Sequence, residues 1–361
     1  MLTTDKIAIR YNKLVRSLIV NFIFWYGSFL FYMFMTGELQ IFKIYLNLLE
    51  ADNIFYVILF LSVWISILFT FFDLIFTDRL MRFFPARLTT LFKSVIYFSS
   101  AFAIIFIASR SPITIFKSKD YSELLDQLPD LNIYFIRFLA HFYLSIIINN
   151  FFKGLVRKMG KGNLRNWMFG LLNKPRETTR IFMFIDMKSS TTIAEKLEHK
   201  KFSHLVQDVF NDMAVVGLYK ADIYNYLGDG AVITWNVKRG LKNNNFLRAY
   251  YAFVHVINKR HRYYARKYGI IPKFKAGVHV GKVMVLQVGQ VRRDISYNGD
   301  TINTAARIES MCNEYHQDLL ISGDLHDMII DKSPFSFKNI SNIKLKGKRK
   351  AVDIYQVKKK Q

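Results

Sequence analysis

Phe184-Ile185-Asp186-Met187 and Leu227-Gly228-Asp229-Gly230 are the two stretches that decide the fold of this chain. In each, an Asp follows an apolar, β-branched or aromatic run, at a point where a strand is expected to give way to a turn. Carboxylates on two adjacent strand ends can hold a pair of hard cations beside a polyphosphate. Either stretch alone is ambiguous, because an Asp before a helix or inside a hairpin turn is common.

An alternation of strands and helices surrounds the two stretches. Strands are expected at 181–186, 223–227, 231–235, 274–280, 283–288 and 319–322. One or two helices are expected at 191–220, single helices at 244–268 and 301–313, and a terminal hairpin that ends at 353–357. Strand, helix, hairpin, helix, strand is the βαββαβ order of a ferredoxin-like sheet. That order would place Asp186 and Asp229 side by side. The fold class expected for residues 181–361 is therefore α+β.

Residues 1–152 have the composition of a transmembrane domain. Charge is sparse there, and four apolar helices are expected at about 17–37, 54–76, 91–109 and 132–152. The uncharged runs Ser17–Gly37 and Ile54–Phe72 are each long enough to cross a hydrocarbon core of about 30 Å. Buried helices of a soluble domain are the alternative interpretation, and it is stronger for the last two helices than for the first two.

The charges in the loops predict an orientation. Lys and Arg gather before the first expected span, between the second and third, and in the basic juxtamembrane linker 153–180, whereas Asp and Glu dilute them in the other two loops. Positive-inside bias places both termini and residues 181–361 in the cytoplasm, in a multi-pass protein of the inner (plasma) membrane.

The net charge of +24 fits attraction to the anionic leaflet of a lipid bilayer. No nucleic-acid partner is expected, because the sequence has no stacking-aromatic or zinc motif of that kind. The single Cys312 excludes an internal disulfide.

Arg137 and His141 are four residues apart and share one face of the fourth expected helix. Ionisable groups inside a membrane are functional candidates. We favour the simpler interpretation, in which Arg137 reaches the outer interface and His141 is a hydrogen-bonded packing residue; a sensor role is the alternative.

Three further segments supply groups that suit a phosphorylated substrate. Ser189, Ser190 and Thr191 follow the first Asp at an expected helix start, where backbone N–H groups and hydroxyls can cradle phosphate oxygens. Asn303 and Arg307 are one helical turn apart, an amide and a guanidinium that can grip a ribose and a phosphoryl group. Close to the C-terminus, Lys344-Leu345-Lys346-Gly347-Lys348 offers cations for a polyphosphate tail.

Together these motifs resemble those of the class III nucleotidyl cyclases, the adenylate/guanylate cyclase family, over about Arg180–Val357. The residues that carry the resemblance are Phe184-Ile185-Asp186-Met187, Leu227-Gly228-Asp229-Gly230, Gly299-Asp300-Thr301-Ile302-Asn303-Thr304-Ala305-Ala306-Arg307 and Leu345-Lys346-Gly347. The resemblance implies a cyclase catalytic domain at 181–361, a role in signal transduction, and conversion of a nucleoside triphosphate to its 3′,5′-cyclic monophosphate and pyrophosphate.

The resemblance also implies a role for each matching residue. Asp186 and Asp229 would hold two divalent cations, Mg²⁺ or Mn²⁺, with a contact from the Met187 carbonyl. Asn303 would orient the ribose, Arg307 would stabilise the transition state, and Lys346 would bind the terminal phosphates. In this family the metal pair and the Asn/Arg pair come from different subunits, so a homodimer is expected.

The positions that select the base depart from the family pattern. Adenylate cyclases commonly have a Lys with an Asp or Thr there, and guanylate cyclases a Glu and a Cys; this chain has Asn225 and Ser296. Both side chains can donate and accept, so the base stays open. ATP is favoured by base rate over GTP or a pyrimidine triphosphate. A catalytically inactive membrane receptor or scaffold, and a basic protein that binds nucleic acid or anionic lipid through its linker, are the alternatives from other classes.

Overall fold

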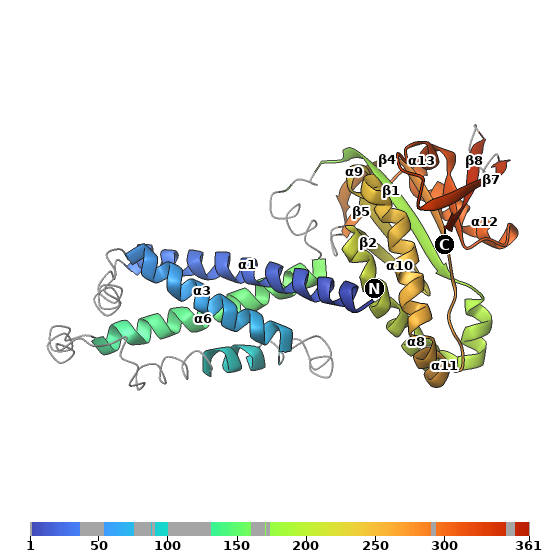
Figure 1. Cartoon of the computed structure of the whole chain (residues 1–361). Coiled ribbons are helices and arrows are strands. Elements are labelled where there is room, and N and C mark those ends of the chain that lie inside the picture. Colours follow the sequence, from blue (N-terminus) through green and yellow to red (C-terminus); the bar gives the residue numbers. More distant parts are fainter. Residues whose placement is uncertain are drawn as a thin grey trace. The chain divides into compact units, whose positions relative to one another are not determined.

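A computed structural model describes residues 2–36, 54–75, 88, 91–99, 131–159, 170, 174–289, 294–343 and 351–360 (Figure 1). The chain divides into two compact units, Met1–Arg165 and Asn166–Gln361, and each is described by itself.

The first unit is helical. Its long helices are α1 (Leu2–Thr36), α3 (Ile54–Ile75) and α6 (Leu131–Met159), and a shorter helix covers residues 91–99. Their apolar side chains pack around Trp25, Phe29, Phe69 and Phe142. The helix α6 continues through Met159, so it enters the segment expected as linker.

Among the described residues of this unit, two helices are long and apolar enough to cross a membrane, judged by length and composition alone. They are Leu14–Thr36 and Ile136–Val156, and the apolar part of α3, Ile58–Asp73, is shorter. Residues 100–109 of the third expected span lie outside the described residues. The expectation of four spans therefore stays a prediction.

The second unit is a mixed α/β domain built on a sheet of eight strands. The strands are β1 (Arg176–Met187), β2 (Asp222–Leu227), β3 (Gly230–Asn236), β4 (Phe274–Val288), β5 (Asp294–Asn298), β6 (Leu319–Ser322), β7 (Phe335–Ile343) and β8 (Val352–Lys359). Their order is β2-β3-β1-β4-β6-β8-β7, and β5 pairs with β4. The neighbours β2-β3-β1-β4 are joined antiparallel, which places the end of β1 beside the β2–β3 turn.

Helices cover both faces of this sheet. The helices are α8 (Ser190–Met213), α9 (Val237–Leu241), α10 (Asn245–Lys259), α11 (His261–Tyr268), α12 (Asp300–Glu314) and α13 (Gly323–Asp327). On one face Met183 and Ile185 of β1 pack with Leu205 of α8 and Phe253 of α10. On the other face Phe182 packs with Ala305 of α12. Because side chains alternate along a strand, Asp186 has the same parity as Phe182 and lies on the α12 face.

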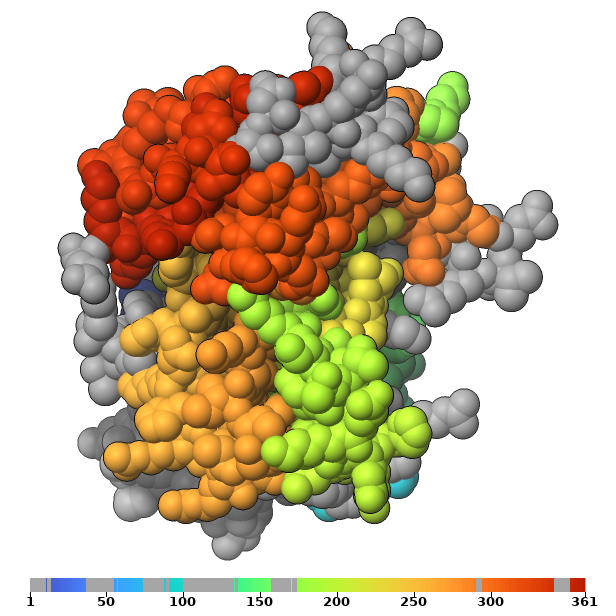
Figure 2. Space-filling model, turned by 90° about the vertical axis from the view of Figure 1, so that its right-hand side faces the viewer, coloured from blue at the N-terminus to red at the C-terminus, as the bar shows by residue number. Residues whose placement is uncertain are grey.

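The helices α8 and α11 lie side by side (Figure 2). Asp208 of α8 accepts hydrogen bonds from the hydroxyls of Tyr263 at 2.7 Å and Tyr268 at 2.6 Å, and pairs with Lys267 at 2.9 Å. These bonds hold the pKa of Asp208 below its ordinary value, against the opposing effect of its burial.

The structure differs from the expected elements at several places. The strands expected at 274–280 and 283–288 are one strand, β4, and the helix expected at 244–268 is two, because Arg260 leaves the helical conformation. The first strand starts at Arg176, and neither β5 nor α13 was expected. The Gly281-Lys282 pair suggests a turn, but Gly281 lies in the strand because α12 crosses it there: a Cβ at Gly281 would be 2.4 Å from Thr301 Oγ1.

Candidate active site

Asp186 and Asp229 meet at one end of the sheet. Asp186 is the penultimate residue of β1, and Asp229 lies in the turn between β2 and β3. Gly230 makes the close approach possible, because a Cβ there would stand 2.7 Å from Ile185 O and 3.0 Å from Asp186 Oδ1. The atom Asp229 Oδ2 is buried and has no hydrogen-bond partner within the described part of the chain. An acceptor left in this state is suited to a cation.

A buried ion-pair network supports Asp186 from the α12 face. Lys275 of β4 faces Asp186 in register, and its Nζ lies 3.4 Å from Asp186 Oδ2 and 2.7 Å from Glu309 Oε1 of α12. Burial, then the negative charges of Asp229 and Glu309, raise the pKa of Asp186 to about 6, while Lys275 opposes the rise. Two carboxylates held this close are stabilised by a cation between them.

Sequence reasoning missed Lys275 and Glu309. The available signal was a Lys inside an apolar strand, Phe274-Lys275-Ala276, since a charge at a buried strand position requires a partner. The partner itself was not visible, because Glu309 lies on a helix 34 positions later in the chain.

The turn after Asp186 enters α8 directly. Met187 is buried, Ser189 adopts a left-handed conformation at φ 55°, and Ser190 begins the helix. Ser189 and Thr191 are exposed and Ser190 is half-buried. The three hydroxyls therefore stand at the N-terminus of α8, next to the carboxylate pair, on a first segment that ends where Glu198 leaves the helical conformation (φ 59°, ψ 162°).

Asn303 and Arg307 lie on α12, Asn303 exposed and Arg307 half-buried. The Nη1 atom of Arg307 is buried without a hydrogen-bond partner among the described residues. The start of α12 is fixed by Thr301 Oγ1, which donates to Lys282 O at 2.7 Å. Further along, a Cβ at Gly277 would be 2.1 Å from Glu309 N, so the helix runs antiparallel to β4 in close contact.

This packing separates Asn303 from the carboxylate pair of its own chain. Asn303 follows Thr301, which contacts Gly281, whereas Asp186 pairs with Lys275. Gly281 and Lys275 are six residues apart on β4, a distance of about 20 Å along a strand. The structure therefore joins Asp186 with Asp229, and places the start of α12, near Asn303, against the middle of β4 rather than beside that pair.

The two base-selecting candidates lie on neighbouring segments. Asn225 is exposed at a register shift of β2, and Ser296 is half-buried on β5 opposite Leu286. The rings of Tyr224 and Tyr297 are 5.0 Å apart, which brings the two strands together. Ser296 Oγ donates to Asn298 Oδ1 at 2.9 Å. Lys346 lies outside the described residues.

The residues present fit divalent cations of the hard type. Carboxylate oxygens are the ligands that Mg²⁺ and Mn²⁺ prefer, and one or two carboxylates with substrate phosphates are a common arrangement for Mg²⁺. The described residues contain no cluster of three or more His, Cys, Asp and Glu able to hold a metal by itself. The Asp186–Asp229 pair is thus suited to ions that a phosphate ligand also binds.

Residues 173–359 match the model of the adenylate and guanylate cyclase catalytic domain. The match covers more than half of the chain, and the chain belongs to this family.

Curated relatives are named adenylate cyclases. Adenylate cyclase 2 of Rhizobium meliloti is 32% identical over 168 residues, 46% of this chain and 46% of that protein. Adenylate cyclase 1 of the same organism is 27% identical over 182 residues, 48% of this chain and 27% of that protein. The alignments thus span half or less of these relatives.

A solved bacterial light-regulated adenylyl cyclase has the same fold at 19% identity. The superposition has a TM-score of 0.51 and covers 64% of this chain and 66% of that one.

Proposed function

We propose that this chain is a nucleotidyl cyclase, a phosphorus–oxygen lyase that converts a nucleoside triphosphate to its 3′,5′-cyclic monophosphate and pyrophosphate. The observation that carries the proposal is the approach of the β2–β3 turn, which holds Asp229, to Asp186, together with the buried Asp229 Oδ2, which has no hydrogen-bond partner among the residues that the structure describes. Membership of the cyclase family, and relatives named adenylate cyclases, support the same reaction.

Asp186, Asp229 and the Met187 carbonyl would hold two divalent cations. When bound, these ions lower the pKa of the ribose 3′-hydroxyl and neutralise the triphosphate. Ser189, Ser190 and Thr191 would orient phosphate oxygens at the start of α8, and Lys346 would bind the terminal phosphates. Asn303 would hold the ribose, and the guanidinium of Arg307, whose Nη1 has no hydrogen-bond partner among the described residues, would meet charge that develops on the α-phosphoryl group.

The site is completed by a second copy of the chain. Thr301, two residues before Asn303, contacts β4 at Gly281, about 20 Å along the strand from Lys275 beside Asp186, which supports contribution of Asn303 to the carboxylates of the partner. Arg307 of the same helix would act with it. A two-fold symmetric homodimer would contain two such composite sites.

ATP is the substrate we propose. The names of the relatives favour it, whereas Asn225 and Ser296 are compatible with either purine edge. We also propose that the helical unit spans the plasma membrane with four helices and that residues 181–361 work in the cytoplasm. The spans Leu14–Thr36 and Ile136–Val156 and the distribution of Lys and Arg support this placement.

One experiment tests the reaction. The purified full-length chain is incubated with each of the four nucleoside triphosphates and Mn²⁺, and products are identified by mass spectrometry. Cyclic AMP is the expected main product, and it should disappear with Asp186→Ala and persist with Lys282→Met, since Lys282 pairs with Glu177 on the exposed surface. Absence of a cyclic product from every nucleotide would favour the inactive receptor instead.

A further inference from the structure

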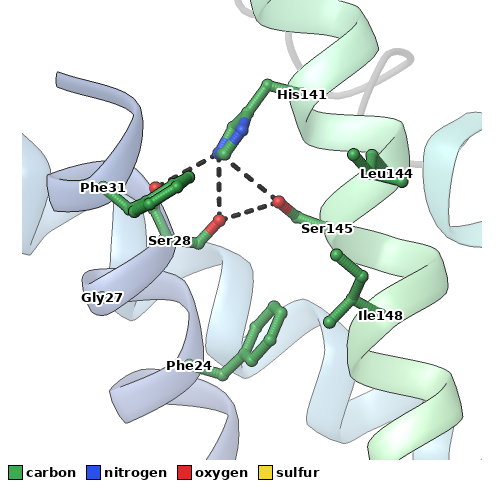
Figure 3. A pocket seen from close by; sticks show the side chains of 8 residues that line it. All are labelled: Phe24, Gly27, Ser28, Phe31, His141, Leu144, Ser145 and Ile148. Carbon is green, nitrogen blue, oxygen red and sulfur yellow. Dashed lines mark hydrogen bonds between the residues drawn. The ribbon is translucent and has the colours of Figure 1, made fainter. Parts of the chain in front are cut away.

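A pocket of about 320 Å³ opens between α1 and α6 in the helical unit (Figure 3). Four apolar side chains line most of it, and three polar residues stand together on its wall: the lining is Phe24, Gly27, Ser28, Phe31, His141, Leu144, Ser145 and Ile148. Its volume falls in the range of about 300–1,000 Å³ that holds small molecules, and an apolar wall with a few converging polar groups is the usual design of such sites.

The three polar residues form one hydrogen-bonded cluster. His141 Nε2 lies 3.0 Å from Ser28 Oγ, 3.2 Å from Ser28 O and 3.4 Å from Ser145 Oγ, and the two hydroxyls are 2.8 Å apart. The carbonyl Ser28 O can only accept, so Nε2 carries the hydrogen when that bond is made. The two serine hydroxyls each retain further capacity to accept, and these positions are available to a ligand.

Polar groups on a helix of this apolar character are costly unless they are paired or used. The hydrogen bonds within the cluster pair some of its polar atoms with one another, but the cluster does not fill the pocket beside it. Gly27 leaves the floor of the pocket open, because a Cβ there would have no heavy atom within 4 Å.

We propose that this pocket binds a lipophilic molecule that carries one hydroxyl or carbonyl group. The polar group would exchange hydrogen bonds with Ser28, Ser145 and His141, and the apolar body would lie against Phe24, Phe31, Leu144 and Ile148. A helix of a second copy is the other occupant to consider, and the labelling experiment below distinguishes the two.

Photolabelling of the full-length chain tests the proposal. The probe is a twelve-carbon alcohol with a diazirine in its chain and a terminal alkyne, and labelled peptides are mapped by mass spectrometry. Labelling should concentrate on the segments that contain residues 24–31 and 141–148 and should be competed by 1-dodecanol. Gly27→Leu should remove it, because the new side chain occupies the pocket. Gly154→Leu is the matched control: like Gly27 it is a helical glycine with open space, but it lies on α6 and does not line the pocket, so the variant should keep the labelling.

A second comparison tests how much the polar groups of the pocket contribute to binding. In the parent chain 1-dodecanol should compete about tenfold better than dodecane. In the double variant Ser28→Ala, Ser145→Ala the two competitors should become equivalent. Uniform labelling that neither competitor reduces, or labelling unchanged in Gly27→Leu, would show an ordinary lipid-facing groove and overturn the proposal. Labelled products that join two chains at these segments would show a helix interface and overturn it as well. The readout needs no nucleotide, so its failure leaves the proposed cyclase reaction untouched.

Discussion

Lys275 is ion-paired with Asp186 across the β4–β1 ladder, its Nζ 3.4 Å from Asp186 Oδ2, and the same ammonium lies 2.7 Å from Glu309 Oε1 on α12. The Lys275 side chain is only 8% exposed. One buried cation therefore links a candidate metal ligand to the helix that carries Asn303 and Arg307.

Replacement of Lys275 should destabilise the cyclase unit. Lys275→Met leaves Asp186 and Glu309 without their counter-charge, and breaking a buried pair of this kind costs about 3 kcal/mol. We expect the thermal transition of the full-length chain, followed by tryptophan fluorescence, to fall by several degrees, and Lys275→Arg to recover part of the loss. Lys282→Met is the control, because its ion pair with Glu177 joins the same two strands but is exposed, and exposed pairs contribute little. An equal shift in both Met variants would contradict the special role of Lys275.

Cation binding should release protons from Asp186. The pKa of this carboxyl is raised to about 6, so at pH 6 about half of it is protonated, and Mn²⁺ requires the carboxylate. Titration calorimetry at pH 6 in buffers of different ionisation enthalpy should therefore detect release of about half a proton for each Mn²⁺ bound at this carboxylate. The release should vanish near pH 8.

Asp186→Asn gives the matching stability experiment in the absence of metal. The folded-state pKa of Asp186 is raised, so the folded chain binds the extra proton between about pH 4 and pH 6, and its stability falls as pH rises through that window. The Asn variant should be more stable than the parent at pH 8 and equal to it near pH 4. If the Asn variant were instead less stable than the parent at pH 8, the attraction of Lys275 would have a larger effect on the pKa of Asp186 than burial and the neighbouring carboxylates together.

Gly230→Ala should impair the carboxylate pair more than the fold. The new Cβ would stand 2.7 Å from Ile185 O and 3.0 Å from Asp186 Oδ1, so the β2–β3 turn must move away from β1. A shift of this size at a site of two ligands should lower kcat at least about tenfold. Gly217→Ala is the control, because a Cβ there meets no heavy atom within 4 Å. Full activity in Gly230→Ala would show that the turn tolerates the shift.

Much of the sheet was predictable because its strands carry strong local signals. Ile181–Asp186 and Ala231–Trp235 are apolar runs that end at turn residues, and both are strands in the structure. The errors arose where tertiary packing, and not the local sequence, determines the secondary structure. Gly281 interrupts the apolar pattern of β4, yet it is a strand residue that admits Thr301 of α12, and no local signal reveals a helix that crosses there.

Part of the candidate site, the neighbouring pair Asp186 and Asp229, was predictable from the same local signals as the sheet. Asp186 and Asp229 lie at recognisable strand ends, and their neighbourhood follows from the strand order. The contacts of Lys275 with Asp186 and Glu309 join three separate elements, so their pairing depends on register and helix placement rather than on spacing in the sequence. Sequence alone also leaves the base open, since the hydrogen-bonding capacity of Asn225 and Ser296 is the same for either purine.

Mixing two inactive variants should restore activity if the sites are shared between subunits. Asp186→Ala removes the metal pair of one chain, and Arg307→Ala removes the guanidinium that the other chain supplies. In an equal mixture about half of the dimers are mixed, and each mixed dimer keeps one intact site of two, so about a quarter of the parent activity should return. The measurement is cyclic nucleotide formation after co-expression or subunit exchange. A mixture of Asp186→Ala with Asp229→Ala is the matched control and should stay inactive, because both variants lack the metal-binding half. If the first mixture also stays inactive although mixed dimers are isolated, each chain would have to complete its own site. That outcome would oppose the placement of the start of α12 at Gly281, about 20 Å along β4 from Lys275 and Asp186.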